Sequence, residues 1–240
     1  MQHKQTFYPT MKIYLFFIFI SISMLFNLDM KGQGLINDFD DVYGMNPVLY
    51  NGRIYVDYYD ASVKGNQFLD SPKYKSGSIQ INHQVFENQY LNYDIFKQKL
   101  LLSFKNYNQT LRILDVPIQN IQSFSLLGQD FIIYTMPDSA LKIFQIIGKD
   151  ALPIYLHWEK EMKTTTSTSV YDYRFTEARR QIWIVKSNQI QMLSNNKSLL
   201  KLYSNEQAIE IKKWLKDQRI KINRASNHQL QLLAEYLYTL

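Results

Sequence analysis

Short apolar segments recur at the spacing of β-strands across residues 79–136, and turn residues separate them. In chain order they read IQIN, YLNYD, KLLLSF, TLRIL, IQSFSL and DFIIYTM. Leu91 and Tyr93 fall on one face of their segment, and Leu100 and Leu102 answer them two residues apart. The stretch DIFKQ between the two pairs predicts a reversal of the chain. The whole region therefore predicts an antiparallel β-meander.

Further strands are expected on both sides of this meander. Before it, the turn dipeptide Asn51-Gly52 separates LY from RIYVDYY and predicts a hairpin. After it, residues 141–163 predict another hairpin, whose second arm, LPIYLHWEKEMK, alternates apolar and polar positions. The run TTTSTS that follows predicts an exposed loop or a frayed strand end. Two more strands are expected at YDYRF and IWIVKSNQIQML.

From Ser204 onward the periodicity changes from strand-like to helical. Ser204 and Ser226 are each followed three residues later by Gln, the spacing of a capping box, which predicts helices around 206–219 and 227–240. Their apolar stripes are Ala208, Ile211 and Leu215 in the first helix and Leu230, Leu233 and Leu237 in the second. Such stripes need a surface to cover, and the sheet is the obvious one.

These patterns predict an α+β protein. Its main part is a mostly antiparallel β-meander that curls into a sandwich or half-barrel, with two C-terminal helices packed on the sheet. The expected division places an N-terminal extension and signal peptide at 1–33, the antiparallel β domain at 34–203 and the helical pair at 204–240.

An almost wholly apolar run, residues 13–28, follows Lys12 and has the layout of a secretory signal peptide, which predicts an N-terminal signal helix. Met11 offers an alternative start of translation directly before it. A transmembrane anchor is the competing interpretation, because the run is close to the length that spans a bilayer.

Cleavage is expected between Gly32 and Gln33, with Ser21 or Ser23 as alternative ends. The chain has no cysteine, which excludes disulfides, a thiolate nucleophile, Cys-ligated zinc and the lipid anchor of a lipoprotein. We therefore expect an exported protein, periplasmic or associated with the outer membrane, that is not a lipoprotein.

The formal charge of the chain is +6. Residues 1–33 contribute three Lys and one Asp, so the rest has 24 basic and 20 acidic residues and a net charge of +4. One basic stretch stands out, with Lys212, Lys213, Lys216, Arg219, Lys221 and Arg224 opposed only by Asp217. It predicts the polar face of an amphipathic helix, or contact with an anionic membrane surface or an acidic partner. Nucleic acid is not expected as a partner, because the protein is expected to be exported.

The strongest candidate for a metal or acid–base site is His157, Glu159 and Glu161. They lie at i, i+2 and i+4 of a predicted strand, so their side chains would leave the same face. The same alternation also arises when one face of a strand is simply wet. His83 and His228 have no acidic or nucleophilic company in sequence. No nucleophile elbow, zincin helix, P-loop or dinucleotide-binding turn occurs, so no catalytic residue and no cofactor is assigned.

The segments NPVLYNGRIYVDYY and GSIQINHQVFENQYLNYDIFKQKLLLSF, followed by a basic helix ahead of NHQLQLLAEYLYTL, resemble a family of exported Bacteroidetes proteins without an assigned function. In that family a P-hydrophobic-hydrophobic-Y-N-G start, a Y-D hairpin and a Lys-rich C-terminal helix recur. The resemblance covers most of the mature chain, and its motifs are structural, so it implies no catalytic residue. The strand-rich sorting domain of type IX secretion cargo is not found at the C-terminus, which points to the periplasm or the inner side of the outer membrane.

Together these observations predict a non-catalytic binding or assembly module of the bacterial envelope, whose partner is an envelope protein or an apolar or glycan ligand. A hydrolase with a dispersed site and a periplasmic lipid carrier are the alternatives. A glycan-binding module is another, because exposed tyrosines can stack on sugar rings. The candidates for that role are Tyr50, Tyr55, Tyr58 and Tyr59.

Overall fold

The computed structural model describes residues 45–57, 59, 62–148, 150–167, 170–187 and 189–240. The predicted extension and signal peptide at 1–33, with the alternative start at Met11, lie outside the described residues, as does Tyr58. Residues 45–240 form one compact unit, so the strands and the C-terminal helices belong together. Within the described ranges, no helix is both long enough and apolar enough to cross a membrane.

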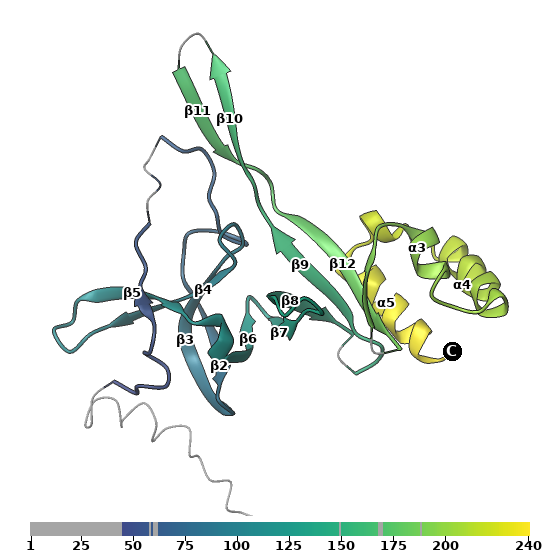
Figure 1. The fold of residues 1–240 in the computed structure, drawn as a ribbon, viewed down its shortest axis with the longest axis horizontal. Coiled ribbons are helices and arrows are strands. Elements are labelled where there is room, and N and C mark those ends of the chain that lie inside the picture. The colour runs from purple at the N-terminus through teal and green to yellow at the C-terminus, as the bar shows by residue number, and fades with distance from the viewer. Residues whose placement is uncertain (1–44, 58, 60–61, 149, 168–169, 188) are drawn as a thin grey trace, which may run out of the picture. The chain divides into compact units, whose positions relative to one another are not determined.

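Most of the described strands form one eleven-stranded antiparallel sheet in the order β1-β5-β4-β3-β2-β6-β7-β8-β9-β12-β13 (Figure 1). Their bounds are β1 Arg53–Ile54, β2 Lys75–Ile81, β3 Gln84–Asp94, β4 Lys99–Lys105, β5 Leu111–Val116, β6 Ile121–Leu126, β7 Gln129–Thr135, β8 Leu141–Ile147, β9 Ile154–Glu159, β12 Arg179–Lys186 and β13 Gln189–Leu193. A two-stranded ribbon of β10 (Met162–Ser167) and β11 (Val170–Phe175) continues the β9–β12 pair. The predicted meander is confirmed.

The predicted reversal between β3 and β4 is also confirmed, in the expected register. Leu91 pairs with Leu102 and Tyr93 with Leu100, so all four side chains leave the same face of the sheet. All four are buried. Gln98, the last residue of the reversal, has a positive φ of 56°.

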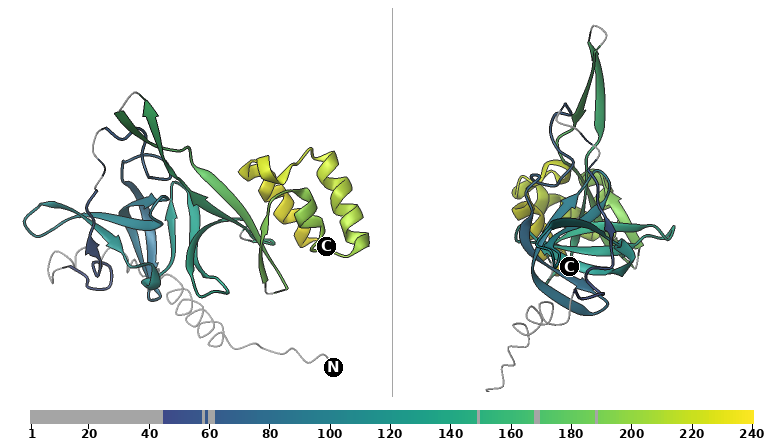
Figure 2. Two further views of the ribbon diagram at one scale, coloured as in Figure 1. Left: turned by 45° about the horizontal axis from the view of Figure 1, so that its top comes forward. Right: turned by 90° about the vertical axis from the view of Figure 1, so that its left-hand side faces the viewer.

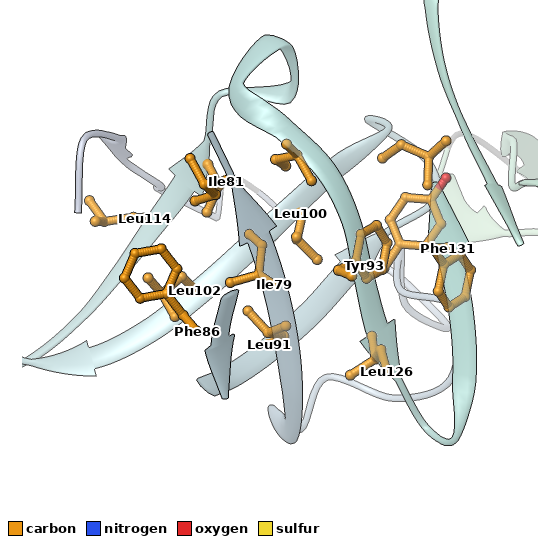
Figure 3. Packing of buried hydrophobic residues seen from close by; sticks show 14 of the residues in the cluster. Ile79, Ile81, Phe86, Leu91, Tyr93, Leu100, Leu102, Leu114, Leu126 and Phe131 are labelled. Atoms are coloured by element: carbon orange, nitrogen blue, oxygen red, sulfur yellow. The ribbon is translucent and has the colours of Figure 1, made fainter. Parts of the chain in front are cut away.

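The sheet curls around its first core. Three strand spacings separate β3 from β7, about 14 Å in a flat sheet. The rings of Tyr93 on β3 and Phe131 on β7 nevertheless lie 5.8 Å apart, and Phe124 on β6 stacks on Phe131 at 4.6 Å. Figure 3 shows Tyr93 and Phe131 close together, with Leu91 and other buried residues of this core between the curved strands. The curl is the one expected of a half-barrel.

A second core forms where the helices pack on the other half of the sheet (Figure 2). The helices are α3 (Asn196–Leu200), α4 (Asn205–Asp217) and α5 (Asn227–Tyr238), with short 3-10 turns at Ile118–Asn120 and Ile222–Arg224. α5 contacts β8 and β9, so the expected packing of helices on the sheet is confirmed. Helix α3 was not expected. Its signal is a capping box in which Asn195 and Ser198 satisfy each other's backbone N–H groups.

The second arm of the predicted hairpin over 141–163 is shorter than its alternation suggests. Strand β9 ends at Glu159, and the chain leaves the large sheet before β10 begins. The ammonium of Lys160 explains the break, because it donates to the carbonyl oxygens of Asn66 and Phe68 at 2.9 and 2.7 Å. The Thr-rich run is partly strand, since residues 164–167 belong to β10, and residues 168 and 169 lie outside the described part.

Candidate functional site

His157, the first of the three predicted metal ligands, is a buried structural donor. It is 7% exposed, and its Nδ1 lies 2.9 Å from the carbonyl oxygen of Ile143 on β8. Burial lowers the pKa of His157, while the hydrogen bond to Ile143 opposes that shift. The imidazole is therefore held neutral, with a proton on Nδ1 directed at Ile143.

The other two predicted ligands bind elsewhere. Oε2 of Glu159 accepts a hydrogen bond from Nε2 of Gln181 at 3.1 Å. Glu161 lies beyond β9, is exposed, and pairs with Arg179 at 3.6 Å. No group of three or more His, Cys, Asp or Glu side chains that could hold a metal ion occurs in the described part of the chain. The structure thus does not bring the three residues together as a ligand set.

A different cluster forms at the β3–β4 reversal, on the face of the sheet opposite the first core. In the strand register, Asp94 lies opposite Lys99, and Arg53 on β1 lies opposite Asp115 on β5. Asp115 also pairs with Leu101, two residues from Lys99. Since residues that pair across a sheet share a face and side chains alternate along each strand, all these side chains leave the same face, opposite Leu91 and Tyr93.

Asp94 lies at the base of this cluster and organises the turn. Its Oδ1 accepts hydrogen bonds from the backbone N–H groups of Phe96 and Lys97 at 3.0 and 2.8 Å. Its Oδ2 accepts one from the hydroxyl of Tyr55 at 3.0 Å. Asp is well suited to this position, because its short carboxylate reaches backbone donors two and three residues ahead. The residue is fully buried, so these bonds replace its lost hydration.

Burial raises the pKa of Asp94, and the hydrogen bonds from Lys97 and Tyr55 oppose that shift. The same carboxylate contributes to raised pKa values around it. Burial is the first cause for Tyr55, Tyr59 and Tyr74, and the charges of Asp94 and Asp57 add to it. These phenols therefore stay protonated at neutral pH, and Tyr55 uses its proton to donate to Asp94.

The positive charge of Lys97 opposes the negative charge of the buried Asp94. Its ammonium lies 5.0 Å from the ring centre of Tyr55 and 4.8 Å from that of Tyr59, within the range of cation–π attraction. It also donates to the hydroxyl of Tyr55 at 3.3 Å. The side chain is thus fixed between two aromatic rings next to a charge of opposite sign.

Two adjoining hollows open beside this turn, and we call them together the basic cleft. Their volumes are about 310 and 300 Å³, and both are lined by Arg53, Lys97, Lys99 and Asp115. Tyr55 lines one hollow and Gln98 the other. Lys99 forms an ion pair with Asp115, whereas the exposed Arg53 has no ion-pair partner among the described residues. Since Asp94 lies next to Lys97 and Asp115 pairs with Lys99, the surplus positive charge of the cleft comes from Arg53.

The side chains that line the basic cleft include no Ser, Thr, Cys or His. A third hollow of about 310 Å³ over β2, β6 and β7 contains Ser125, whose hydroxyl donates to Oδ1 of Asp130 at 2.5 Å. Neither His83 nor His157 lines any of these three hollows.

Of the tyrosines expected to be exposed, the three that the structure describes, Tyr50, Tyr55 and Tyr59, are half-buried instead. Tyr50 packs against Phe104 with ring centres 4.9 Å apart, and Tyr59 packs edge-on against Phe175 at 5.1 Å. Tyr55 is engaged by Asp94 and Lys97 as described above. Aromatic pairing within the protein thus uses the ring surfaces that a flat sugar-stacking platform would need.

The predicted basic stretch is exposed at all six cations, on α4 and on the segment that follows it. His83 lies in the β2–β3 turn, where its backbone N–H donates to Oε1 of Gln122 at 2.8 Å, and His228 is exposed on α5. Neither has a carboxylate hydrogen-bonded to its ring within the described part of the chain.

Comparison of the chain with protein-family models, with curated proteins and with solved structures finds no match. The resemblance to exported Bacteroidetes proteins therefore stays a prediction.

Proposed function

We propose that this protein is an exported, non-catalytic binding module of the bacterial envelope, and that its basic cleft holds an acidic group of the ligand. The apolar leader at residues 13–28 supports export, and the excess of cations in the cleft supports an anionic ligand. The acidic group is a phosphate or a carboxylate.

The observation that carries the proposal is the arrangement of Arg53, Lys97 and Lys99 around the cleft. Arg53 presents an exposed guanidinium, whose planar fork of donors matches a carboxylate or a phosphate. Lys97 is fixed by Tyr55 and Tyr59, so little conformational entropy is lost when a ligand meets it. Asp115 takes up the charge of Lys99, and the cleft keeps a surplus of positive charge.

Calorimetric titration of the purified full chain with inorganic phosphate and with citrate tests the cleft. Arg53→Gln removes a charge-assisted hydrogen bond worth about 1.5–3 kcal/mol, so the affinity for whichever anion binds should fall roughly tenfold or more. Asp115→Asn removes the carboxylate that lines the cleft and should raise the affinity.

Arg112→Gln is the matched control, because Arg112 is exposed on the same strand as Asp115 but does not line the cleft. Its affinity should equal that of the wild type. Loss of binding in Arg112→Gln equal to that in Arg53→Gln would show a general charge effect and contradict the proposal. So would the failure of both anions to bind at millimolar concentration.

Cell fractionation tests the envelope location separately. The processed chain should be found in the periplasmic or outer-membrane fraction of the native cell. An unprocessed chain confined to the cytosol would contradict export, whatever the cleft binds.

A further inference from the structure

Helix α4 presents three lysines on one exposed face with an apolar residue among them. Ile209, Lys212, Lys213 and Lys216 stand at i, i+3, i+4 and i+7, the spacing that places side chains next to each other on one side of a helix. We call these four residues the lysine face. Ile209 is 70% exposed.

The fold fixes the direction of the lysine face. Ile211 and Leu215, on the other side of α4, are buried in the second core. The helix therefore cannot rotate to bury Ile209 without exposing both. The acidic residues Glu206, Glu210 and Asp217 form a neighbouring stripe of the helix on the side of Lys213, displaced from the centre of the lysine face.

Three more cations extend the lysine face beyond the end of α4. Arg219, Lys221 and Arg224 are exposed, while Ile220 and Ile222 between them are buried. This alternation anchors the backbone in the second core and directs the charges outward. None of the six cations forms an ion pair with any residue in the described part of the chain.

We propose that the lysine face, with Arg219, Lys221 and Arg224, binds the surface of an anionic lipid bilayer. Positive charges spread along a helix complement a continuous negative surface, and each cation near such a surface contributes to binding. Ile209 adds a hydrophobic contribution, because its apolar side chain can enter the boundary between headgroups and acyl chains. The inference is independent of the basic cleft, which lies around the β3–β4 turn.

Flotation of the full chain with phospholipid vesicles tests the proposal. One set of vesicles contains phosphatidylcholine alone, and the other contains equal parts of phosphatidylcholine and phosphatidylglycerol. The readout is the difference in binding between the two sets of vesicles. The apolar leader is the same in every variant and can insert into neutral vesicles, so its contribution cancels in this difference. The wild type should prefer the anionic vesicles, and high salt should remove the preference.

The triple variant Lys212→Gln, Lys213→Gln and Lys216→Gln should lose that preference. The expected loss is about fivefold per lysine, on the order of a hundredfold for three. The matched control replaces Lys73, Lys75 and Lys105 by Gln, which changes the net charge by the same amount; these lysines are exposed just before β2, on β2 and on β4. It should keep the preference. Ile209→Ser should weaken binding to the anionic vesicles by a smaller factor.

Three outcomes would overturn the proposal. The first is equal binding of the wild type to neutral and anionic vesicles. The second is equal loss in the two triple variants, which would mean that only the net charge matters. The third is tight, lysine-dependent binding to soluble polyglutamate with no preference for anionic vesicles, which would assign the surface to an acidic protein partner. All substituted lysines are exposed, and the circular dichroism spectra of the variants should match that of the wild type.

Discussion

The side chain of Gln98 connects the β3–β4 turn to strand β9, which contributes Ile154 and Leu156 to the second core. Its Nε2 donates to the carbonyl oxygens of Ile95 and Trp158 at 2.7 and 2.8 Å, and its Oε1 accepts from the hydroxyl of Tyr93 at 2.7 Å. The network continues from the indole N–H of Trp158 to the buried Gln145 at 2.7 Å. Replacing Gln98 by Ala should therefore weaken the connection between the two halves of the sheet.

The magnitude follows from what Gln98→Ala leaves behind. It removes three hydrogen bonds, each with a net contribution of about 0.5–1.5 kcal/mol, and leaves the fully buried hydroxyl of Tyr93 without a partner. We expect the free energy of unfolding to fall by about 3 kcal/mol. For a compact unit of this size, that corresponds to a decrease in Tm of about 6–12 °C. Tyr93→Phe alone should cost about 1 kcal/mol, because it removes one of the three bonds.

Urea unfolding of the two single variants and the double variant measures the coupling. Once Gln98 is gone, removing the Tyr93 hydroxyl also removes an orphaned polar group, so the second substitution should cost almost nothing. The coupling energy should then be about 1 kcal/mol. Gln109→Ala is the matched control, since Gln109 has a φ of 57°, close to the 56° of Gln98, and is exposed. It should change the stability by less than about 0.5 kcal/mol.

Two results would refute this reasoning. The first is strict additivity of the two single variants, within about 0.5 kcal/mol, because it would mean that Gln98 and Tyr93 do not share an energetic contact. The second is a cost of Gln98→Ala no greater than that of Gln109→Ala. In that case the common backbone conformation, rather than the hydrogen-bond network, would determine the effect.

Two further predictions concern the sheet. A Cβ on Gly77 would lie 2.2 Å from the carbonyl oxygen of Ser125, so Gly77→Ala should lower the free energy of unfolding by more than about 2 kcal/mol. Gly128 has open space around it, so Gly128→Ala should cost only the roughly 1–2 kcal/mol of its positive φ. Equal costs in chemical denaturation would contradict the clash. Because burial lowers the pKa of His157, the unfolded chain binds more protons than the folded one below about pH 6.5, and the stability should fall there by up to about 1.4 kcal/mol per pH unit. Asp94, with its raised pKa, changes the stability in the opposite direction above about pH 3.9. The test is therefore the difference in stability between the wild type and His157→Asn as a function of pH. Parallel pH profiles of the two proteins would disprove the role of His157.

Much of the fold could be read from local pattern. The β3–β4 reversal is an example, since the alternation of Leu91 and Tyr93 against Leu100 and Leu102 fixes both the turn and the register. Helix α5 is another, because Ser226 and Gln229 form the predicted capping box at its start. Helix α3 could have been found in the same way, from Asn195 and Ser198.

The metal prediction shows where local pattern fails. Alternation correctly placed His157 and Glu159 in one strand, but it could not reveal that His157 is buried and bonded to Ile143 of the neighbouring strand β8, or that β9 ends at Glu159. Sequence spacing within one strand says which face a side chain leaves, and it does not say what packs on that face.

The amino-acid sequence by itself determined the strands and reversals of the meander, the two long C-terminal helices and the basic stretch that begins at Lys212, because each depends on residues close together along the chain. The hairpin predicted at Asn51-Gly52 is wrong, because β1 pairs with the distant strand β5 instead. Only the tertiary structure decided that Arg53, far away in sequence, pairs with Asp115 and meets Lys97 and Lys99 in a cleft. Pairing between distant strands is selected by the burial of the whole sheet around its cores, and no short segment contains that information.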